Sequence, residues 1–502
     1  MRLSSLLASL LILTTFNIYG QSIGDAILYS QSPYEGTGRN IAMGSATGAM
    51  GGDVTAVYIN PAGLGLYRSN EMTFTTGLQH SLVKSNYYGN NNYAGKANIS
   101  IPNFGYVIAM ECSNYRPLRY LQFSIGLTRT NDHSYHTSAS GLNPNSSMID
   151  SYIQTIDGID ELFDNIHDPE TYLNDNFPYT LHPAWQTYLI DRFQDSIGYF
   201  YDSPIPQGHV YQSNVLESKG RSEEWTLSSS ANFKDRFYIG ASLGIAHLKR
   251  TSTRTYQETP ENPNNPQKTF TDWTFSEDLS DNAWGINAKF GILYAPAHWL
   301  RLGLSAQSRT YYSFEETWNT TTTSNLTSNG KEDYYKYFSP TLNNNYDFSA
   351  PAHYTGSVAF LIGQTGMITT DVEYMNYGKS RLKSNLYSFE DVNNEIKDAL
   401  GHTFNLRFGT EWRMRQFFVR GGTAYYGSPY GFGNSENSIK KLSAGIGYAT
   451  MGGIYWDFAY ELSESKSTFT PYSYYIDGEN IVGPVTQHRW RNKLVATMKI
   501  KL

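Results

Sequence analysis

The feature that most constrains this chain is a repeated two-residue alternation of apolar and polar side chains, with little helical periodicity after residue 67. Successive strand residues point to opposite faces of a sheet, so this period predicts β-strands whose two faces meet different surroundings. The stretch 402–414 is the clearest example. There Phe404, Leu406, Phe408, Trp412 and Met414 share one face, and Asn405, Arg407, Gly409, Glu411 and Arg413 share the other.

We expect an all-β chain of about fourteen antiparallel strands, an even number of the kind that single-chain outer-membrane barrels use. The predicted strands lie near 70–84, 98–110, 118–133, 225–234, 236–250, 282–296, 299–315, 352–362, 365–378, 401–413, 416–427, 439–450, 453–463 and 489–502.

The connections decide between a membrane barrel and a soluble sandwich. Very short turns are expected at 234–235, 296–298, 363–364, 414–415 and 451–452. Long connections are expected at 134–224, 251–281, 316–351, 379–400, 428–438 and 464–488. Short and long connections alternate, as they do when one barrel end faces the periplasm and the other faces the exterior. A closed barrel also pairs every backbone group, which hydrocarbon requires.

Composition agrees with a transmembrane barrel and excludes several other classes. The chain of 502 residues has 17% charged residues, 15% aromatic residues and 41 Tyr. We expect aromatic girdles at the two membrane interfaces. Candidates are Tyr87, Tyr88, Tyr311, Tyr312, Tyr425 and Tyr426 at the outer end, and Trp299 and Trp412 near the short turns. A net charge of −7 gives no basic field for nucleic acid, and one cysteine, Cys112, excludes a disulfide scaffold.

Residues 1–20 have the features of an export signal. Arg2 supplies a positive start, Leu3 to Phe16 is apolar, and Gly20 is a small residue suited to cleavage before Gln21. The apolar run is too short for a membrane-spanning helix. We therefore expect a chain exported to the outer membrane of a Gram-negative cell.

Residues 21–66 do not alternate and are rich in glycine. A compact segment of this kind, placed before the first strand, can fold inside a barrel, where close approach to the wall favours residues without Cβ. The sequence thus predicts an N-terminal hatch at 21–66 and a barrel at 67–502. The alternative, a phosphate-binding loop, lacks the Gly-Lys-Ser/Thr sequence that such loops need.

Several blocks resemble the FadL/TodX family of outer-membrane transporters of long-chain fatty acids and aromatic hydrocarbons. The N-terminal block runs from Arg39 through Gly51 and Gly52 to Asn60, Pro61 and Ala62, and it is similar to the family's hatch. Further blocks at 284–294, 351–360, 371–374, 405–412 and 442–448 resemble the family in the same order.

This resemblance implies passive transport, with capture of a hydrophobic ligand outside, gating by the hatch and lateral release through the wall. It also implies that Asn60, Pro61 and Ala62 lie near the gate, with Gly44, Gly51 and Gly52 as hatch glycines. A tight turn joining the hatch to the first strand is the alternative role of the Asn-Pro-Ala motif. We expect a hydrophobic small molecule and membrane lipid as partners, a monomer, and neither a cofactor nor a metal.

Residues 134–224 form a long extracellular insertion with helical periodicity at 148–163 and 185–193. It predicts either an amphipathic cap over the barrel mouth or an apolar capture surface. The Asn/Thr-rich runs 318–329 and 342–346 are expected to be solvated loop tips.

Enzymatic activity is not expected. His133, His136, His182, His353 and His402 show no catalytic spacing. Charged residues of both signs on the predicted lumen face are expected to hold the hatch: Asp371, Glu373, Arg407, Glu411, Arg413, Asp457 and Glu461. The alternatives to transport are a protein-binding scaffold, resembling the shuttle barrel of type IX secretion, and a general polar porin.

Overall fold

The computed structural model describes residues 22–112, 117–162, 166, 168–196, 198–265, 268–328 and 330–502. The predicted export signal at 1–20 lies outside the described residues. Among those that are described, no helix is long and apolar enough to cross a bilayer.

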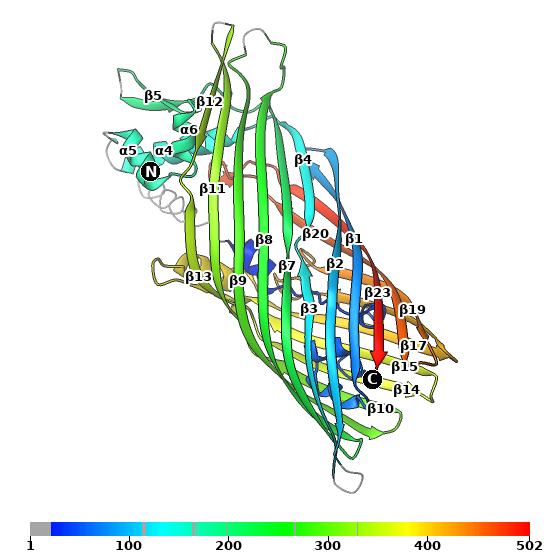
Figure 1. The fold of residues 1–502 in the computed structure, drawn as a ribbon. Coiled ribbons are helices and arrows are strands. Elements are labelled where there is room, and N and C mark those ends of the chain that lie inside the picture. Colours follow the sequence, from blue (N-terminus) through cyan, green and yellow to red (C-terminus); the bar gives the residue numbers. More distant parts are fainter. Residues whose placement is uncertain are drawn as a thin grey trace.

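The molecule is a closed antiparallel barrel of 14 strands, as the sequence predicts (Figure 1). The last strand closes on the first, with Lys501 opposite Glu71 at one end and Thr486 opposite Asn86 at the other. Closure leaves no open sheet edge at membrane depth, which is the condition for a sheet to lie in lipid. The wall consists of β1 (Glu71–Tyr87), β2 (Asn90–Glu111), β3 (Leu118–Asp132), β7 (Val210–Phe233), β8 (Phe237–Pro260), β9 (Phe270–Ala297), β10 (Leu300–Gln307) continued by β11 (Tyr311–Ser328), β13 (Leu342–Ser349) continued by β14 (His353–Ile362), β15 (Gly366–Asn376), β17 (His402–Met414), β18 (Phe417–Tyr426), β19 (Ile439–Ala449), β20 (Ile454–Phe469) and β23 (Val485–Lys501).

The five predicted short turns all join consecutive wall strands. At the first of them, Lys234 and Asp235 both adopt positive φ, the backbone twist that lets a tight turn match the twist of two paired strands. The first hairpin differs from the prediction, because β1 and β2 run on to a tight turn at Tyr88 and Gly89 in place of a loop at 85–97.

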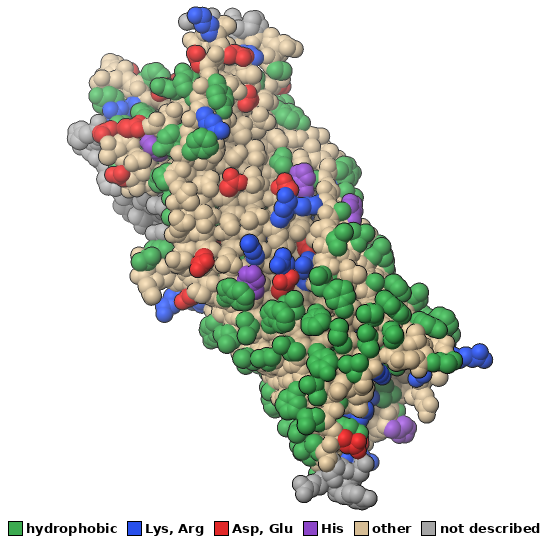
Figure 2. All heavy atoms as spheres, in the orientation of Figure 1, with side chains coloured by type: hydrophobic (Ala, Val, Ile, Leu, Met, Phe, Trp, Pro, Cys, Tyr) green, Lys and Arg blue, Asp and Glu red, His purple; other side chains and the backbone are tan. Residues whose placement is uncertain are grey.

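Apolar side chains cover the outer face of the barrel around the short-turn end, and polar side chains cover the opposite end (Figure 2). Aromatic residues mark both borders of this belt. Exposed rings at the outer border include Trp225, Trp284, Tyr311, Tyr354 and Tyr374, and those near the short turns include Tyr294, Trp299, Trp412, Phe417 and Trp456. The belt and its borders are those of a barrel held in a membrane.

Three of the predicted girdle residues were placed on the wrong face. Tyr87 and Tyr426 are buried inside the barrel, where the Tyr87 hydroxyl donates to Gln212 Oε1 at 2.6 Å. Tyr312 packs against buried apolar residues of the lumen. In the strand pairs Tyr311–Tyr312 and Tyr425–Tyr426 the two side chains point to opposite faces, so both could not lie in the girdle. Tyr88 lies in the turn after β1, and its ring packs against that of Tyr87, with ring centroids 4.6 Å apart.

The wall rises far beyond the membrane on one side (Figure 1). Strands β7, β8 and β9 contain 24 to 28 residues, whereas a membrane strand needs about ten. Together with β4 (Tyr135–Asn143), β11 and β12 (Lys331–Phe338) they form an extracellular sheet. The prediction of loops at 251–281 and 316–351 was therefore wrong over most of their length, because a strand with water on its outer face need not be apolar there.

The runs 318–329 and 342–346 were also predicted wrongly as loop tips. Residues 318–328 belong to β11 and 342–346 to β13, and Thr320, Thr322 and Ser324 are buried. The helices α4 (Met148–Leu162), α5 (Pro169–Asn176) and α6 (Leu181–Gln186) lie in the predicted insertion, beside this sheet. Short hairpins β5 (Asp191–Gln194) with β6 (Tyr199–Asp202), and β21 (Tyr475–Ile476) with β22 (Glu479–Asn480), complete the outer part.

Candidate functional site

The N-terminal segment lies inside the barrel (Figure 1). It comprises α2 (Ile23–Ser30), α3 (Gly38–Ala42) and two short 3-10 helices, η1 (Val54–Tyr58) and η2 (Pro61–Leu66). We call the described residues 22–66 the hatch. Almost all of it from residue 33 onward is buried, so it occupies the lumen at the level of the membrane belt.

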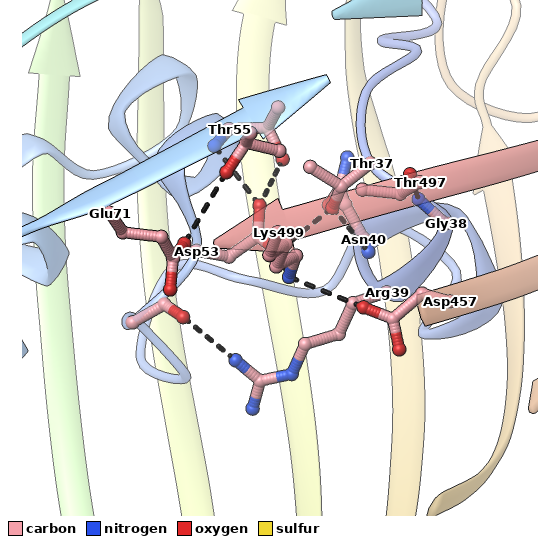
Figure 3. Close-up of polar contacts among 12 residues, drawn as sticks. Thr37, Gly38, Arg39, Asn40, Asp53, Thr55, Glu71, Asp457, Thr497 and Lys499 are labelled. Atoms are coloured by element: carbon pink, nitrogen blue, oxygen red, sulfur yellow. Dashed lines mark hydrogen bonds and ion pairs between the residues drawn. The ribbon is translucent and has the colours of Figure 1, made fainter. Parts of the chain in front are cut away.

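Two hatch residues, Arg39 and Asp53, are connected through a chain of alternating charges on the wall. Arg39 makes a bidentate pair with Glu411, with Nε–Oε2 2.8 Å and Nη2–Oε1 2.9 Å. Glu411 in turn contacts Arg420 at 2.6 Å, and Arg420 contacts Asp457 at 2.6 Å. Lys499 then bridges Asp457 at 3.5 Å and the hatch residue Asp53 at 2.8 Å (Figure 3).

We call Arg39, Glu411, Arg420, Asp457, Lys499 and Asp53 the hatch–wall network. It contains three positive and three negative side chains, drawn from the hatch and from β17, β18, β20 and β23. Its carboxylates also accept hydrogen bonds, since Thr37 and Thr55 donate to Asp53 at 2.8 and 2.6 Å. Buried charges persist when they are paired and hydrogen-bonded in this way.

Further polar contacts hold the hatch above and beside this network. Lys493 of β23 pairs with Glu35, and Lys441 of β19 donates to the Pro33 carbonyl at 2.8 Å while pairing with Glu461. The Gly48 N–H donates to Asp371 Oδ2 at 3.1 Å. The wall therefore holds the hatch through charges and hydrogen bonds as well as through apolar contacts such as those of Ile41 and Ala42 with Ala459 and Val495.

The predicted Asn-Pro-Ala motif connects the hatch to the wall. Asn60 Oδ1 accepts from the Ala62 N–H at 3.0 Å and so caps η2. Asn60 Nδ2 donates to the carbonyls of Gly48, at 2.8 Å, and of Ile292 in β9, at 3.1 Å. Asn60, Pro61 and Ala62 are all buried, and the motif thus serves both as a turn and as a contact between hatch and wall.

Glycines in the wall make room for this motif. A Cβ on Gly291 would lie 2.0 Å from Asn60 Oδ1, and a Cβ on Gly240 would lie 2.4 Å from the Pro61 carbonyl carbon. Real Cβ atoms do not approach other atoms so closely, so the backbones of β8 and β9 and of η2 need glycine at these two positions.

The three predicted hatch glycines all adopt positive φ, 61° at Gly44, 57° at Gly51 and 62° at Gly52. Gly44 lies against the wall, because a Cβ there would be 2.7 Å from Phe408 O and Thr423 N. Gly51 packs within the hatch against Gly63 and Leu66. Gly52 has open space around its Cβ position, with Arg39 Nη1 3.9 Å away.

Four of the seven predicted lumen charges contact the hatch or one another: Asp371, Glu373, Arg407 and Glu411. Asp457 and Glu461 are linked to the hatch through Lys499 and Lys441. Arg407 is fully buried and pairs with Glu373 at 3.2 Å and Asp371 at 3.7 Å. Arg413 lies near the end of β17 and lines a pocket with the hatch residues Gly51 and Gly52, and its Nε donates to the Arg415 carbonyl. Arg39, Arg420 and Lys499 were not among the charges predicted to hold the hatch. Lys499 could have been assigned to the lumen because it lies on the polar face of the last strand. No sequence pattern identifies Asp53 as its partner.

Above the network, α2 packs into an apolar part of the lumen. Its residues Ala26, Ile27 and Tyr29 contact a buried set that we call the upper lumen cluster: Leu248, Ala283, Phe314, Tyr346, Phe348, Met375, Tyr377, Leu382, Phe389, Val392, Ile396 and Leu400. Several of these residues come from α7 (Glu390–Ala399) and the loop before it. The Tyr29 hydroxyl donates to Asp281 Oδ2 at 2.9 Å, so α2 fills the apolar space that a ligand could otherwise occupy.

Beside α2 is a polar cavity of about 100 Å³. It lies between the hatch and the upper walls of β19, β20 and β23, and Arg489, Arg491, Lys493, Glu35 and Glu461 are among the residues that line it.

The ladder between β2 and β3 is interrupted. Pairing begins at Asn103 opposite Thr128. Residues 90–100 of β2 pair with β1 and not with β3, and the β1–β2 register shifts at Ile101 and Pro102. Pro102, which has no N–H, directly precedes the break. Side chains bridge it, with Asn98 Nδ2 donating to Asp132 Oδ2 at 2.8 Å and Lys96 pairing with Glu217 at 3.2 Å. Within the described wall this is a place where lipid and lumen are separated by side chains and not by a backbone ladder.

The predicted insertion forms a packed cap. Met148, Ile149, Tyr152 and Ile156 of α4 are buried against Tyr256, Phe270, Trp273 and Phe275 of the extracellular sheet. Glu258 fixes the start of α4, since it accepts from Met148 N, Ser147 Oγ, Gln212 Nε2, Tyr256 Oη and Trp273 Nε1. The apolar face of α4 is therefore already occupied, as the cap interpretation requires.

No family model matches the sequence, and no curated protein matches it. Solved structures do resemble it. The Pseudomonas putida toluene transporter TodX is similar over 92% of this chain and 97% of its own, with a TM-score of 0.52 and 12% identity. The chain has the fold of these transporters. A Pseudomonas aeruginosa FadL homologue gives a TM-score of 0.53 at 13% identity over 93% of this chain and 98% of its own. The FadL/TodX fold thus includes the barrel and the N-terminal segment within it.

Proposed function

We propose that this chain is an outer-membrane channel for the passive uptake of hydrophobic small molecules, such as long-chain fatty acids or aromatic hydrocarbons. The observation that carries the proposal is that a hatch closes the lumen and is held in place by several individual polar contacts. The fold shared with the toluene transporter TodX supports it, because TodX is a transporter and not an enzyme.

Capture would begin in the upper lumen. Tyr29 and Ile27 of α2 pack among Phe314, Phe348 and Met375, so an apolar ligand that displaced α2 would find the same apolar surroundings. Transfer of each CH₂ from water to such a site is favourable by about 0.8 kcal/mol. A chain of ten or more carbons could therefore offset the loss of the α2 contacts.

Gating would require a change in the hatch–wall network. Separation of Arg39 from Glu411, or of Asp53 from Lys499, exposes charges that the lumen can hydrate, which lowers the cost of breaking each pair. Small movements at Asn60 would act on two places at once, because its Nδ2 bonds both Gly48 and the wall residue Ile292.

Release would occur sideways at the interrupted β2–β3 ladder. A hydrophobic molecule that leaves there enters the membrane without passing through water, and so keeps the favourable transfer energy of its apolar surface. Between β2 and β3 no backbone ladder has to break on the extracellular side of Asn103. Only the side-chain contacts Asn98–Asp132 and Lys96–Glu217 have to separate.

Uptake by cells that lack this gene, with and without the gene restored, tests the proposal. Restoration should raise the initial uptake rate of labelled oleate or toluene and leave uptake of a hydrophilic sugar unchanged. Equal rates with and without the gene, for every hydrophobic compound tried, would contradict the proposal.

A protein-binding scaffold is the second candidate, and one observation favours it. The β5–β6 hairpin carries exposed rings at Phe193, Tyr199 and Phe200, with Phe193 stacked on Phe200 at 5.7 Å. If the scaffold role holds, the intact chain should bind a defined exported protein, and removal of 191–202 should abolish that binding while uptake persists. We further propose that the chain works as a monomer, without nucleic acid and without a cofactor.

A further inference from the structure

An external groove of about 670 Å³ crosses the outer surface of the barrel where β9, β11, β13 and β16 (Arg381–Lys383) lie side by side. Two rows of outward-facing residues follow the strand register across it. The outer row is Trp284, Ser313, Asp347 and Lys383, and the row nearer the membrane centre is Ile286, Tyr311, Ser349 and Arg381. The small side chains of Ser313 and Ser349 lie in the middle of the two rows. The larger side chains at the ends of each row project further from the barrel surface and form the sides of the groove.

One end of the groove is apolar and lies at the outer border of the membrane belt. Trp284, Ile286 and Tyr311 are 53%, 50% and 59% exposed, and Trp284 and Tyr311 belong to the outer aromatic girdle. Such rings lie at the level of lipid headgroups. The apolar end of the groove is therefore in contact with the outer leaflet and not with bulk water.

The other end is cationic. Arg381 and Lys383 flank the buried Leu382 in β16 and so project from one face of the strand. The exposed Lys379 ends the 3-10 helix η3 (Tyr377–Lys379) just before them. Arg381 is held in place, since its Nη1 donates to the carbonyls of Gly378 and Ser380 at 2.8 and 2.6 Å. Within the described chain no ion pair involves any of the three cations, and Asp347 is the carboxylate residue that lines the groove.

The segment after this row carries an exposed apolar side chain. Leu386 follows Lys383 by three residues and is 83% exposed, an unfavourable position in water for a large apolar side chain. Insertion of Leu386 into the leaflet would remove that cost and hold the basic row at headgroup depth.

We propose that this groove binds a phosphate-bearing lipid of the outer leaflet. The phosphate contacts Arg381 and Lys383, with Lys379 beside them, and the acyl chains lie on Trp284 and Ile286. The site is separate from the transport route, because the inward-facing Tyr312 and Phe348 form its floor and close it from the lumen. The lipid connects β13 and β16 to β9 and so stabilises the wall where β10 passes into β11.

Native mass spectrometry of the full chain in a neutral detergent tests the site, with phosphorylated lipid A as probe and phosphatidylcholine as the uncharged comparison. Each basic residue near a membrane surface contributes about fivefold to the affinity for an anionic lipid. Lys379→Ser/Arg381→Ser/Lys383→Ser should therefore weaken lipid A binding about a hundredfold. The matched control Lys249→Ser/Lys440→Ser/Lys466→Ser removes three exposed cations elsewhere and should bind as the wild type does.

A second variant keeps every charge. Ser313→Trp fills the centre of the groove and should reduce lipid A retention at least tenfold, while the heat-dependent shift of the folded barrel on SDS gels confirms that it folds. Three results would overturn the proposal: unchanged binding by the triple variant, equal binding of phosphatidylcholine, or full displacement of the lipid by inorganic phosphate, which would indicate a site for soluble anions.

Discussion

Lys499 Nζ lies 2.8 Å from Asp53 Oδ2, an ion pair between the last strand of the barrel and the hatch across 446 positions of sequence. Both side chains are buried, with 7% and 0% of their surfaces exposed. The strand that closes the barrel therefore also holds the segment that blocks it, and assembly of the wall and docking of the hatch depend on each other.

Removal of the Lys499 charge should loosen the hatch. Lys499→Met leaves the buried Asp53 and Asp457 without their shared cation, and breaking a buried pair by deleting one partner costs about 3–5 kcal/mol. We expect faster amide hydrogen exchange at 38–58 in the variant. Lys440→Met, at an exposed position of β19, is the matched control and should leave exchange unchanged. Exchange in Lys499→Met at the wild-type rate would show that the pair does not hold the hatch.

Asn60→Ala should make the barrel leak. The substitution removes the η2 cap and both Nδ2 hydrogen bonds, a loss of about 1–2 kcal/mol for the cap alone. Single-channel recording in planar bilayers should then show more frequent ion-conducting openings than in the wild type. Asn343→Ala changes an exposed residue of β13 and should conduct as the wild type does. The assignment of Asn60 to the gate fails if the two variants behave alike.

The two hatch glycines 44 and 52 provide a matched pair. Both have positive φ, near 61°, so alanine costs about 1–2 kcal/mol of backbone strain at either position. At Gly44 the new methyl group would also meet Phe408 O and Thr423 N at 2.7 Å, whereas at Gly52 its nearest neighbour is 3.9 Å away. Thermal unfolding should show the larger loss for Gly44→Ala. Equal losses would mean that Gly44 does not lie against the wall as described.

The start of α4 should be sensitive to pH. Burial raises the pKa of Asp150 from 3.8 to about 7, even though its Oδ2 accepts from the Ser147 N–H at 2.7 Å. A pKa raised on folding means that the carboxyl's contribution to stability is present at low pH and is lost as the pH rises through about 7. Burial raises the pKa of Glu258 at the same helix end, which acts in the same direction.

Hydrogen exchange across 148–162 between pH 5 and pH 8.5, corrected for the intrinsic rate, measures this effect. Protection should fall with rising pH in the wild type and fall less in Asp150→Asn, which cannot ionise. The same fall in both proteins would assign the pH dependence to Glu258 or to another group.

The sequence predicted the membrane part of the wall well because the two faces of each strand meet opposite environments. In β17, Phe404, Leu406 and Phe408 face lipid while Asn405 and Arg407 face the lumen, and a period of two follows directly. Above the membrane that contrast disappears, since water reaches the outer face. Runs such as 318–328 then have the composition of a loop although they form a strand.

The hatch was predictable as a segment but not as a set of contacts. Its glycines and the Asn60-Pro61-Ala62 motif indicate a compact fold beside a wall, and the polar faces of β17 and β23 place Glu411 and Lys499 in the lumen. Which hatch residue meets which wall residue depends on the rotation of the hatch within the barrel. No local pattern encodes that rotation, so the partners Arg39 and Asp53 could not be assigned.

A reversible cross-link between hatch and wall tests the gating proposal most directly. A Cβ on Gly105 of β2 would lie 3.3 Å from the Cβ of Val54 in η1, close to the separation of about 3.8 Å in a disulfide. The variant Val54→Cys/Gly105→Cys is made in a chain that also carries Cys112→Ser. When this protein is oxidised, cells should take up labelled oleate or toluene no faster than cells without the gene, and reduction should restore uptake. Val54→Cys alone should not respond to oxidation. Equal uptake by the oxidised and reduced double variant would contradict transport through a moving hatch.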